Sequence, residues 1–291
     1  MPNRSDPTVI TPRLLREWPL PVPGRSADKG ARGTVLVVGG SRFTPGAVLL
    51  AGVAALRAGA GVLQLAVAES TAAALSIQVP EALVIGLPET QAGSVAGRPP
   101  ERLAELAGNA RAIAIGPGLD NIEETGTLLR ALLDAAGPDT ALVLDAYALG
   151  ALSHDPDLLA EREYPAVLTP NLTEAKFLLG REPDDDLGRT AASLADRYGA
   201  VVSLFGHIAA PDGRTWREES GDAGLGTSGS GDVRAGIVAG LLSRGADPAQ
   251  AACWGAYAHA ASGQRLAARF GRIGFLAREI VDGVPQTLAE I

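Results

Sequence analysis

The sequence contains few of the residues that build disulfides, metal clusters or large aromatic surfaces. Its 291 residues include one cysteine, three histidines and 4% aromatic residues. The single Cys253 excludes an intrachain disulfide, and the scattered histidines do not have the spacing of a zinc motif. The chain is 46% hydrophobic, which is enough for one sizeable buried core.

Runs of positive charge and long apolar segments are also missing. The net charge is −8 and the isoelectric point is about 5.0, so nucleic acid and anionic membranes are unsuitable partners. The polar, proline-rich stretch from Met1 to Ser26 lacks the apolar segment of a signal peptide, and no membrane-spanning run follows. We therefore expect a cytoplasmic protein that acts on small molecules.

Short apolar runs alternate with helical segments along the chain. Strands are expected at 34–38, 63–67, 82–85, 112–115, 141–144, 166–168 and 201–204, with a hairpin at 207–210 and 214–216. Helices are expected at 46–58, 101–107, 123–133, 173–179 and 189–198, and over most of the chain after 230. This alternation predicts an α/β fold with a mostly parallel sheet covered by helices on both faces. Residues 1–28 are expected to form an irregular arm, and 29–291 a single domain.

Polar and glycine-rich segments follow directly after several of these strands. They are Gly39-Gly40-Ser41, Gly116-Pro117-Gly118, Asp145 and Thr169-Pro170-Asn171. Because ligands bind beyond the carboxyl ends of parallel strands, we expect these segments to gather at one edge of the sheet.

The turn Gly229-Ser230-Gly231-Asp232 carries the strongest chemical signal. An apolar helical run, 233–242, follows it at once, so glycine-rich backbone amides and a helix N-terminus meet at one point. That arrangement suits a phosphate group. Asp232 has two possible roles, as the cap of the helix and as a base that deprotonates an attacking hydroxyl.

The turn and its neighbours resemble the NAD(P)H-hydrate dehydratase branch of the ribokinase-like superfamily. The matching segments occur in order from about residue 28 to 288: Lys29-Gly30, Gly39-Gly40-Ser41, Pro45-Gly46-Ala47, Arg57 to Gly61, Gly116 to Leu119, Val143 to Ala146, Leu168 to Glu174, Thr227 to Leu242, and Gly274 to Pro285. The resemblance implies a three-layer α/β/α sandwich. It also implies dehydration of (S)-NAD(P)H-hydrate with ADP or ATP, by phosphoryl transfer to the ring hydroxyl and loss of phosphate.

The resemblance also assigns roles by position. Asp232 would be the general base, and the amides of Gly229, Ser230 and Gly231 would stabilise the transferred phosphoryl group. The hydrated nicotinamide would contact Ala47, Gly118, Asn171 and Asp232. The nucleotide would contact Phe205, Gly206, His207, Ile208, Ala209 and Gly231. Mg²⁺ would bridge the phosphates, with Asp145 and Glu174 as tentative ligands, and the enzyme would be a homo-oligomer such as a tetramer.

Four positions depart from the pattern of this branch. Phe205 replaces a lysine suited to phosphate, Asn171 replaces a histidine, Tyr147 replaces an aspartate, and Asp222-Ala223 replaces Asn-Pro. A kinase of a small alcohol and a nucleotide-binding relative with reduced activity therefore remain open alternatives.

Several polar residues have competing interpretations. Asp145 suits a magnesium site and a helix cap equally well, and Glu174 suits a metal contact or a helix start. His259 and Cys253 lie in the small-residue run 251–261, which favours helix packing over ligation. The acidic run Asp184-Asp185-Asp186 is typical of a solvated loop that begins a helix.

Overall fold

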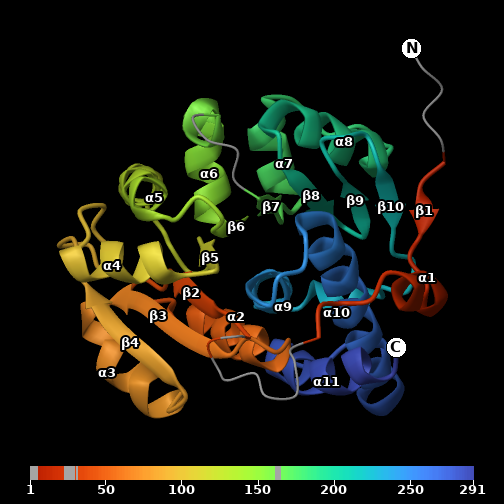
Figure 1. The fold of residues 1–291 in the computed structure, drawn as a ribbon, viewed down its shortest axis with the longest axis horizontal. Helices are drawn as coiled ribbons and strands as arrows, with labels where there is room; N and C mark the ends of the chain where they lie inside the picture. Colours follow the sequence, from red (N-terminus) through yellow and green to blue (C-terminus); the bar gives the residue numbers. More distant parts are fainter. Residues whose placement is uncertain (1–5, 23–29, 31, 161–164) are drawn as a thin grey trace.

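The computed structural model describes residues 6–22, 30, 32–160 and 165–291. Within them a ten-stranded sheet has the order β1-β10-β9-β8-β7-β6-β5-β2-β3-β4 (Figure 1). Strands β8, β7, β6, β5, β2, β3 and β4 are parallel, β9 is antiparallel to both neighbours, and β1 pairs parallel to β10. The strand bounds are β1 Thr8–Val9, β2 Thr34–Val38, β3 Val62–Ala68, β4 Ala82–Leu87, β5 Ala112–Ile115, β6 Ala141–Leu144, β7 Ala166–Leu168, β8 Val201–Leu204, β9 His207–Ala209 and β10 Thr215–Arg217.

Helices cover both faces of this sheet, as the sequence predicted. One buried apolar cluster joins α1, α2, α3, α9, α10 and α11 to one face, and a second joins α4 to α8 to the other (Figure 1). The helix bounds are α1 Pro12–Glu17, α2 Pro45–Arg57, α3 Glu69–Gln78, α4 Glu101–Asn109, α5 Ile122–Ala135, α6 Tyr147–His154, α7 Leu172–Leu179, α8 Leu187–Tyr198, α9 Ser230–Ser243, α10 Pro248–Phe270 and α11 Ala277–Ala289; short 3₁₀ helices are η1 Pro156–Leu159 and η2 Ala223–Gly226. The three-layer architecture is confirmed.

The N-terminal arm is more ordered than its sequence predicts. Its described part, 6–22, forms β1 at the sheet edge and α1, where the Thr11 side chain accepts a hydrogen bond from the Leu14 amide. Leu15 is fully buried in the core. The prediction of an irregular arm is therefore wrong for this part, because Leu15 anchors it. The rest of the arm, together with Lys29, lies outside the described residues.

Close backbone contact fixes α9 against α2. A Cβ atom on Gly236 would lie 2.1 Å from the Ala51 carbonyl oxygen, and one on Gly240 would lie 2.4 Å from the Ala55 carbonyl oxygen. Only glycine fits at such distances. Two glycines one turn apart thus determine where α9 lies beneath the sheet, and with it where its N-terminus lies.

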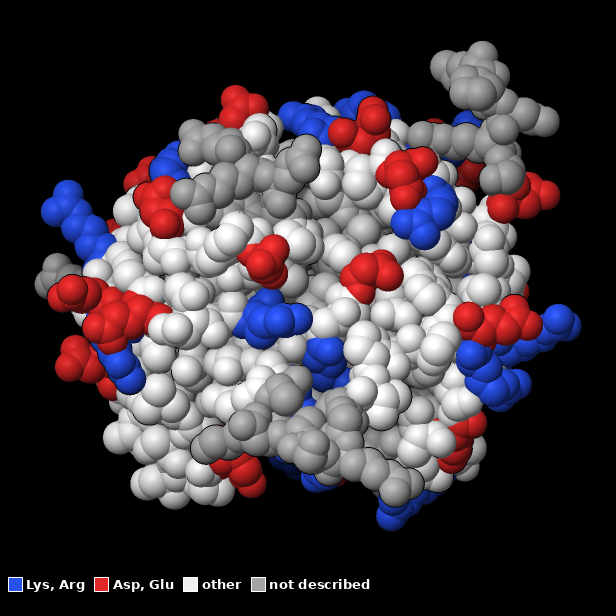
Figure 2. All heavy atoms as spheres, in the orientation of Figure 1, with Lys and Arg blue, Asp and Glu red and all other residues white. Residues whose placement is uncertain are grey.

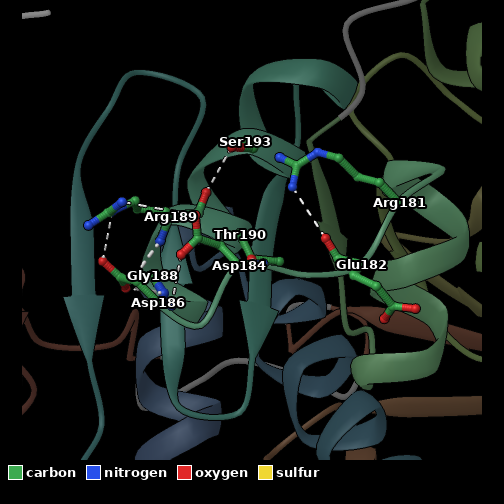
Figure 3. Close-up of polar contacts among 8 residues, drawn as sticks. All are labelled: Arg181, Glu182, Asp184, Asp186, Gly188, Arg189, Thr190 and Ser193. Atoms are coloured by element: carbon green, nitrogen blue, oxygen red, sulfur yellow. Dashed lines mark hydrogen bonds and ion pairs between the residues drawn. The ribbon is translucent and has the colours of Figure 1, made fainter.

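The acidic run begins a helix, as predicted (Figure 3). The Asp186 carboxylate accepts hydrogen bonds from the Gly188 and Arg189 amides and caps α8. Arg189 also pairs with Asp186 at 3.2 Å and approaches Asp184 at 3.9 Å. These carboxylates are engaged in local structure.

The visible surface carries both signs of charge. In Figure 2, acidic and basic side chains lie interspersed over the visible face, including its centre, with no large patch of one sign. In the part of the chain that the structure describes, no helix has both the length and the apolar character needed to cross a membrane.

Candidate active site

The loops that follow the central strands meet at one edge, as expected. The Gly40 amide donates to the Pro117 carbonyl at 2.8 Å, and the Ser41 amide donates to the Gly118 carbonyl at 2.7 Å. The Asp145 carboxylate accepts a hydrogen bond from the Thr169 hydroxyl at 2.8 Å. The ends of β2, β5, β6 and β7 therefore form one continuous polar edge.

The N-terminus of α9 points its amides at this edge. Gly229 is the N-cap, with φ of 87°, a left-handed conformation that favours glycine. Asp232 is the third residue of the helix, so Gly229 holds the capping position that Asp232 was a candidate for. The Ser230 amide donates to the Thr227 carbonyl at 3.2 Å, whereas no backbone acceptor among the described residues engages the amides of Gly231 and Asp232. The Gly229 amide likewise has no backbone acceptor in the described part of the chain, so two of the three amides predicted to bind phosphate, those of Gly229 and Gly231, are free, together with that of Asp232.

Two pockets open on either side of this helix end. The β9-side pocket has a volume of about 610 Å³ and includes Ser230 and Gly231 in its lining. The α2-side pocket has a volume of about 640 Å³ and includes Gly229 and Asp232. The amide-rich turn is therefore the wall that the two pockets share.

The predicted site residues divide between these pockets. The α2-side pocket contains Ala47 and Gly118 together with Asp232, as the resemblance implies for one ligand. Asn171 lies instead in the β9-side pocket, beside the residues predicted to contact a nucleotide. Its side chain accepts a hydrogen bond from the Glu174 amide and Glu174 accepts one from the Asn171 amide, which forms a capping box at α7.

The predicted nucleotide-contacting stretch only partly faces its pocket. Phe205, Gly206 and His207 line the β9-side pocket. Ile208 and Ala209 are 1% exposed and belong to the cores on opposite faces of the sheet. Ile208 and Ala209 lie on opposite faces because successive side chains of a strand alternate between the two faces of a sheet.

Phe205 has a strained backbone. Phe205 and Gly206 form the two-residue turn between β8 and β9, with φ of 46° and 79°. Such a turn favours Asn-Gly, and phenylalanine is uncommon in the left-handed region. The Phe205 side chain is 58% exposed and lies at the pocket, so the strain places an aromatic ring where a ligand can contact it.

Three carboxylates at the site have raised pKa values, and neighbouring carboxylate charges contribute to two of them, Asp232 and Glu174. Burial, and then the charges of Asp145 and Glu174, raise the pKa of Asp232 from 3.8 to about 7. Burial is also the main cause that raises the pKa of Glu174 to about 7 and the pKa of Asp145 above its ordinary value. A carboxylate with a pKa near neutrality is well matched to accept a proton at physiological pH.

The backbone beside Asp145 is strained as well. Ala146 is the N-cap of α6 and has φ of 47° and ψ of −121°. Asp145 therefore does not cap this helix, and its carboxylate points to Thr169 and the site instead. The helix-cap interpretation is therefore wrong, and the magnesium role of Asp145 stays a prediction.

Two site residues were missed by the sequence analysis. His259, interpreted as a helix-packing residue, shares a hydrogen bond of 2.9 Å with the buried Ser230 hydroxyl, and burial lowers its pKa to about 3. Arg234 lines the β9-side pocket and donates to the Thr169 carbonyl at 2.8 Å. A sequence signal existed for both, because each is a polar residue within an otherwise apolar helix and needs a buried partner.

The parallel sheet and the anion-binding helix end between two pockets define a ribokinase-like α/β enzyme. The family model for NAD(P)H-hydrate dehydratase matches residues 35–286, so the chain belongs to this family. The resemblance stated from the sequence is confirmed.

Individual relatives agree with this assignment. The chain is 45% identical to the ADP-dependent (S)-NAD(P)H-hydrate dehydratase of Xanthomonas campestris pv. campestris, over 96% of each chain. It is 38% identical to the bifunctional NAD(P)H-hydrate repair enzyme Nnr of Moorella thermoacetica, where 94% of this chain spans 52% of the relative. The structure of the ADP/ATP-dependent NAD(P)H-hydrate dehydratase of Bacillus subtilis, co-crystallised with ATP and Mg²⁺, has a TM-score of 0.79 and 28% identity, covering 98% of this chain and 99% of that one.

Proposed function

We propose that this enzyme dehydrates (S)-NAD(P)H-hydrate to NAD(P)H at the expense of ADP, with ATP as the alternative nucleotide. The observation that carries the proposal is the position of the α9 N-terminus between two pockets. The nucleotide enters the β9-side pocket and the hydrated nicotinamide enters the α2-side pocket. The terminal phosphate then lies at the free amides of the first helical turn, where the dipole of α9 favours its charge.

Asp232 begins the reaction by removing a proton. It faces the α2-side pocket, so its carboxylate takes the proton of the ring hydroxyl while the hydroxyl oxygen attacks the terminal phosphorus. The bond from phosphorus to the bridging oxygen breaks, and ADP leaves as AMP. Phosphate then departs from the ring carbon with the bonding electrons and accepts the proton of the neighbouring carbon, and the electrons of that C–H bond form the double bond of NAD(P)H.

Residues around the helix end hold this arrangement. Gly229 and Gly231 leave room for substrate and phosphate, and His259 orients the buried Ser230 hydroxyl in the lining of the β9-side pocket. Phe205 offers a ring on which a nucleotide base can stack. These are the roles we assign to the predicted site residues.

The carboxylates fit a magnesium ion that arrives with the nucleotide. Among the described residues no three His, Cys, Asp or Glu side chains gather into a metal site. Asp145 accepts hydrogen bonds from the Thr169 hydroxyl and the Ala146 amide, and Glu174 accepts one from the Asn171 amide; the remaining acceptor capacity of the two carboxylates would reach the ion directly or through water. Mg²⁺ commonly takes one or two carboxylates together with substrate phosphates, and when bound it neutralises phosphate charge.

One assay tests the reaction. The purified chain is incubated with hydrated NADH, Mg²⁺ and either ADP or ATP, and the recovery of NADH absorbance is followed, with Asp232→Asn as the inactive control. We expect recovery with at least one nucleotide. No recovery with either would refute the proposal, and a product alcohol that keeps its phosphate would identify a kinase instead.

The proposal includes an oligomeric state and a cellular location. A homotetramer is the assembly that the resemblance implies, and light scattering on the purified chain measures it. A cytoplasmic location accords with a diffusible substrate, and fractionation of cells tests it.

A further inference from the structure

Arg234 is a half-buried cation whose hydrogen-bonding capacity is only partly used. Its Nη2 donates to the Thr169 carbonyl, but its Nε is buried and has no hydrogen-bond partner. An unpaired polar group in the protein interior costs stability, because it has lost its hydrogen bonds to water without gaining others. A donor kept at that cost is expected to have a partner in the working enzyme.

The position of Arg234 indicates what that partner is. Arg234 lies four residues after Ser230 in α9, so both side chains are on the same face of the helix and both line the β9-side pocket. The guanidinium therefore stands one turn from the free amides of the helix N-terminus. Both features attract a ligand of negative charge to the same end of the pocket.

Neighbouring negative charges stabilise the guanidinium without occupying its Nε donor. Asp145 and Glu174 attract Arg234 electrostatically, yet among the described residues no carboxylate oxygen lies within ion-pair distance of it. The charge of Arg234 is thus kept in place while Nε stays free. A carboxylate partner in direct contact would have taken the donor.

A second unpaired donor lies on the same wall. Ser203 is 1% exposed, lines the β9-side pocket, and its hydroxyl has no partner. Val202 pairs with Leu168 in the sheet, so Ser203 on β8 lies beside Thr169, the residue that follows the end of β7. Two unused donors close to one another suit a ligand rich in acceptor oxygens, as phosphates are.

We propose that Arg234 binds the phosphates of the nucleotide co-substrate, with its Nε donating to a phosphate oxygen. Arg234 is then the protein's own cation at the site of phosphoryl transfer, alongside the helix amides. The inference deepens the proposed function and rests on it for the identity of the ligand. It assigns to α9 both parts of the phosphate site, the amides of its first turn and a side chain of its second.

Binding measurements on the full chain test this role. Calorimetry with Mg²⁺ compares ADP and adenosine for the wild type, Arg234→Gln and Arg244→Gln. Arg244 is a matched control, because it is a half-buried arginine at the opposite end of α9 that donates to the carbonyls of Ala58 and Pro21. A lost charged hydrogen bond weakens binding by about tenfold to a hundredfold.

We expect Arg234→Gln to weaken ADP binding by at least about tenfold and to change adenosine binding by less than about threefold. Arg244→Gln is expected to leave both affinities close to the wild-type values. An Arg234→Gln variant that weakens ADP and adenosine equally, or weakens neither, overturns the proposal. Arg234→Lys, which keeps the charge, is expected to retain more ADP binding than Arg234→Gln.

A crystal structure of the wild-type chain with ADP and Mg²⁺ decides the question if Arg234→Gln does not fold. A guanidinium nitrogen within about 3.2 Å of a phosphate oxygen supports the proposal, and a guanidinium that contacts only protein overturns it. The dehydration assay tests the proposed reaction separately from the role of Arg234. Arg234-dependent ADP binding without recovery of NADH refutes the proposed reaction alone, and recovery that is insensitive to Arg234→Gln refutes this inference alone.

Discussion

Replacing Asp232 by asparagine separates the effect of a buried carboxylate on the stability of the fold from its effect on the rate of the reaction. The pKa of Asp232 is raised from 3.8 to about 7, by burial first and then by the charges of Asp145 and Glu174. Between these two values the folded chain holds a proton that the unfolded chain has released. The free energy of unfolding therefore falls as pH rises through this window, and the penalty of Asp232 disappears as the pH falls to about 4.

The magnitude follows from the size of the shift. About three pKa units at about 1.4 kcal/mol each give an upper bound of about 4 kcal/mol above pH 7. Asparagine removes this penalty but also removes a negative charge from the first turn of a helix, which is worth up to about 1 kcal/mol. Asp232→Asn is thus expected to raise the free energy of unfolding by at most about 3 kcal/mol at about pH 8, with little effect at about pH 4.

Urea unfolding at these two pH values, on either side of the isoelectric point of about 5.0, measures the difference. The same variant is expected to lose a factor of about 10² to 10⁴ in the rate of NADH recovery, since the general base is gone. Equal stability of wild type and variant at both pH values would refute the argument that the carboxylate is desolvated. A variant that gains stability and keeps its activity would show that Asp232 is buried but is not the base.

Three further predictions concern the surroundings of the site. Phe205→Asn is expected to stabilise the fold by about 1 kcal/mol, because asparagine tolerates the left-handed conformation, and to raise the KM for ADP; thermal unfolding and steady-state kinetics measure the two effects. His259→Leu is expected to lower the free energy of unfolding by about 1–3 kcal/mol and to slow turnover, since the Ser230 hydroxyl loses its buried partner, whereas His259→Gln is expected to keep most of both. Gly236→Val is expected to destabilise the chain by at least about 1–3 kcal/mol through its clash with the Ala51 carbonyl, while the control Gly126→Ala, where a Cβ meets only ordinary contact, is expected to be neutral or stabilising; a tolerated Gly236→Val would contradict the close packing of α2 on α9.

The central strands could be predicted from the sequence because they are buried on both faces. Thr34–Val38, Ala112–Ile115 and Ala141–Leu144 have the bounds that their apolar runs predict. Helix α3, Glu69–Gln78, was missed because its alanine-rich sequence has no side-chain cap and little segregation of polar and apolar residues. Helix α6 was considered only as a helix that Asp145 could cap and was given no bounds, because its N-cap is the strained Ala146, a conformation that no local pattern signals.

The candidate site, like the fold, could be predicted only in part from the sequence. The anion-binding turn and the polar edge could be predicted, since each depends on glycines and strand ends that are visible in the sequence. The partnership of Ser230 with His259 depends on the packing of α9 against α10, which joins residues 29 positions apart. The free Nε of Arg234 is likewise a property of the packed structure, because only the surroundings decide which donors find acceptors.

The packing of α9 on α2 links the stability of the fold to the geometry of the reaction. α2 contributes Ala47 to one pocket, and α9 contributes Gly231 and Arg234 to the other. The backbones of these helices touch at Gly236, so neither can shift without the other. In the proposed reaction, the distance between a hydroxyl in the α2-side pocket and a phosphate in the β9-side pocket would therefore be set by a backbone contact in the core, which is the kind of fixed positioning that phosphoryl transfer requires.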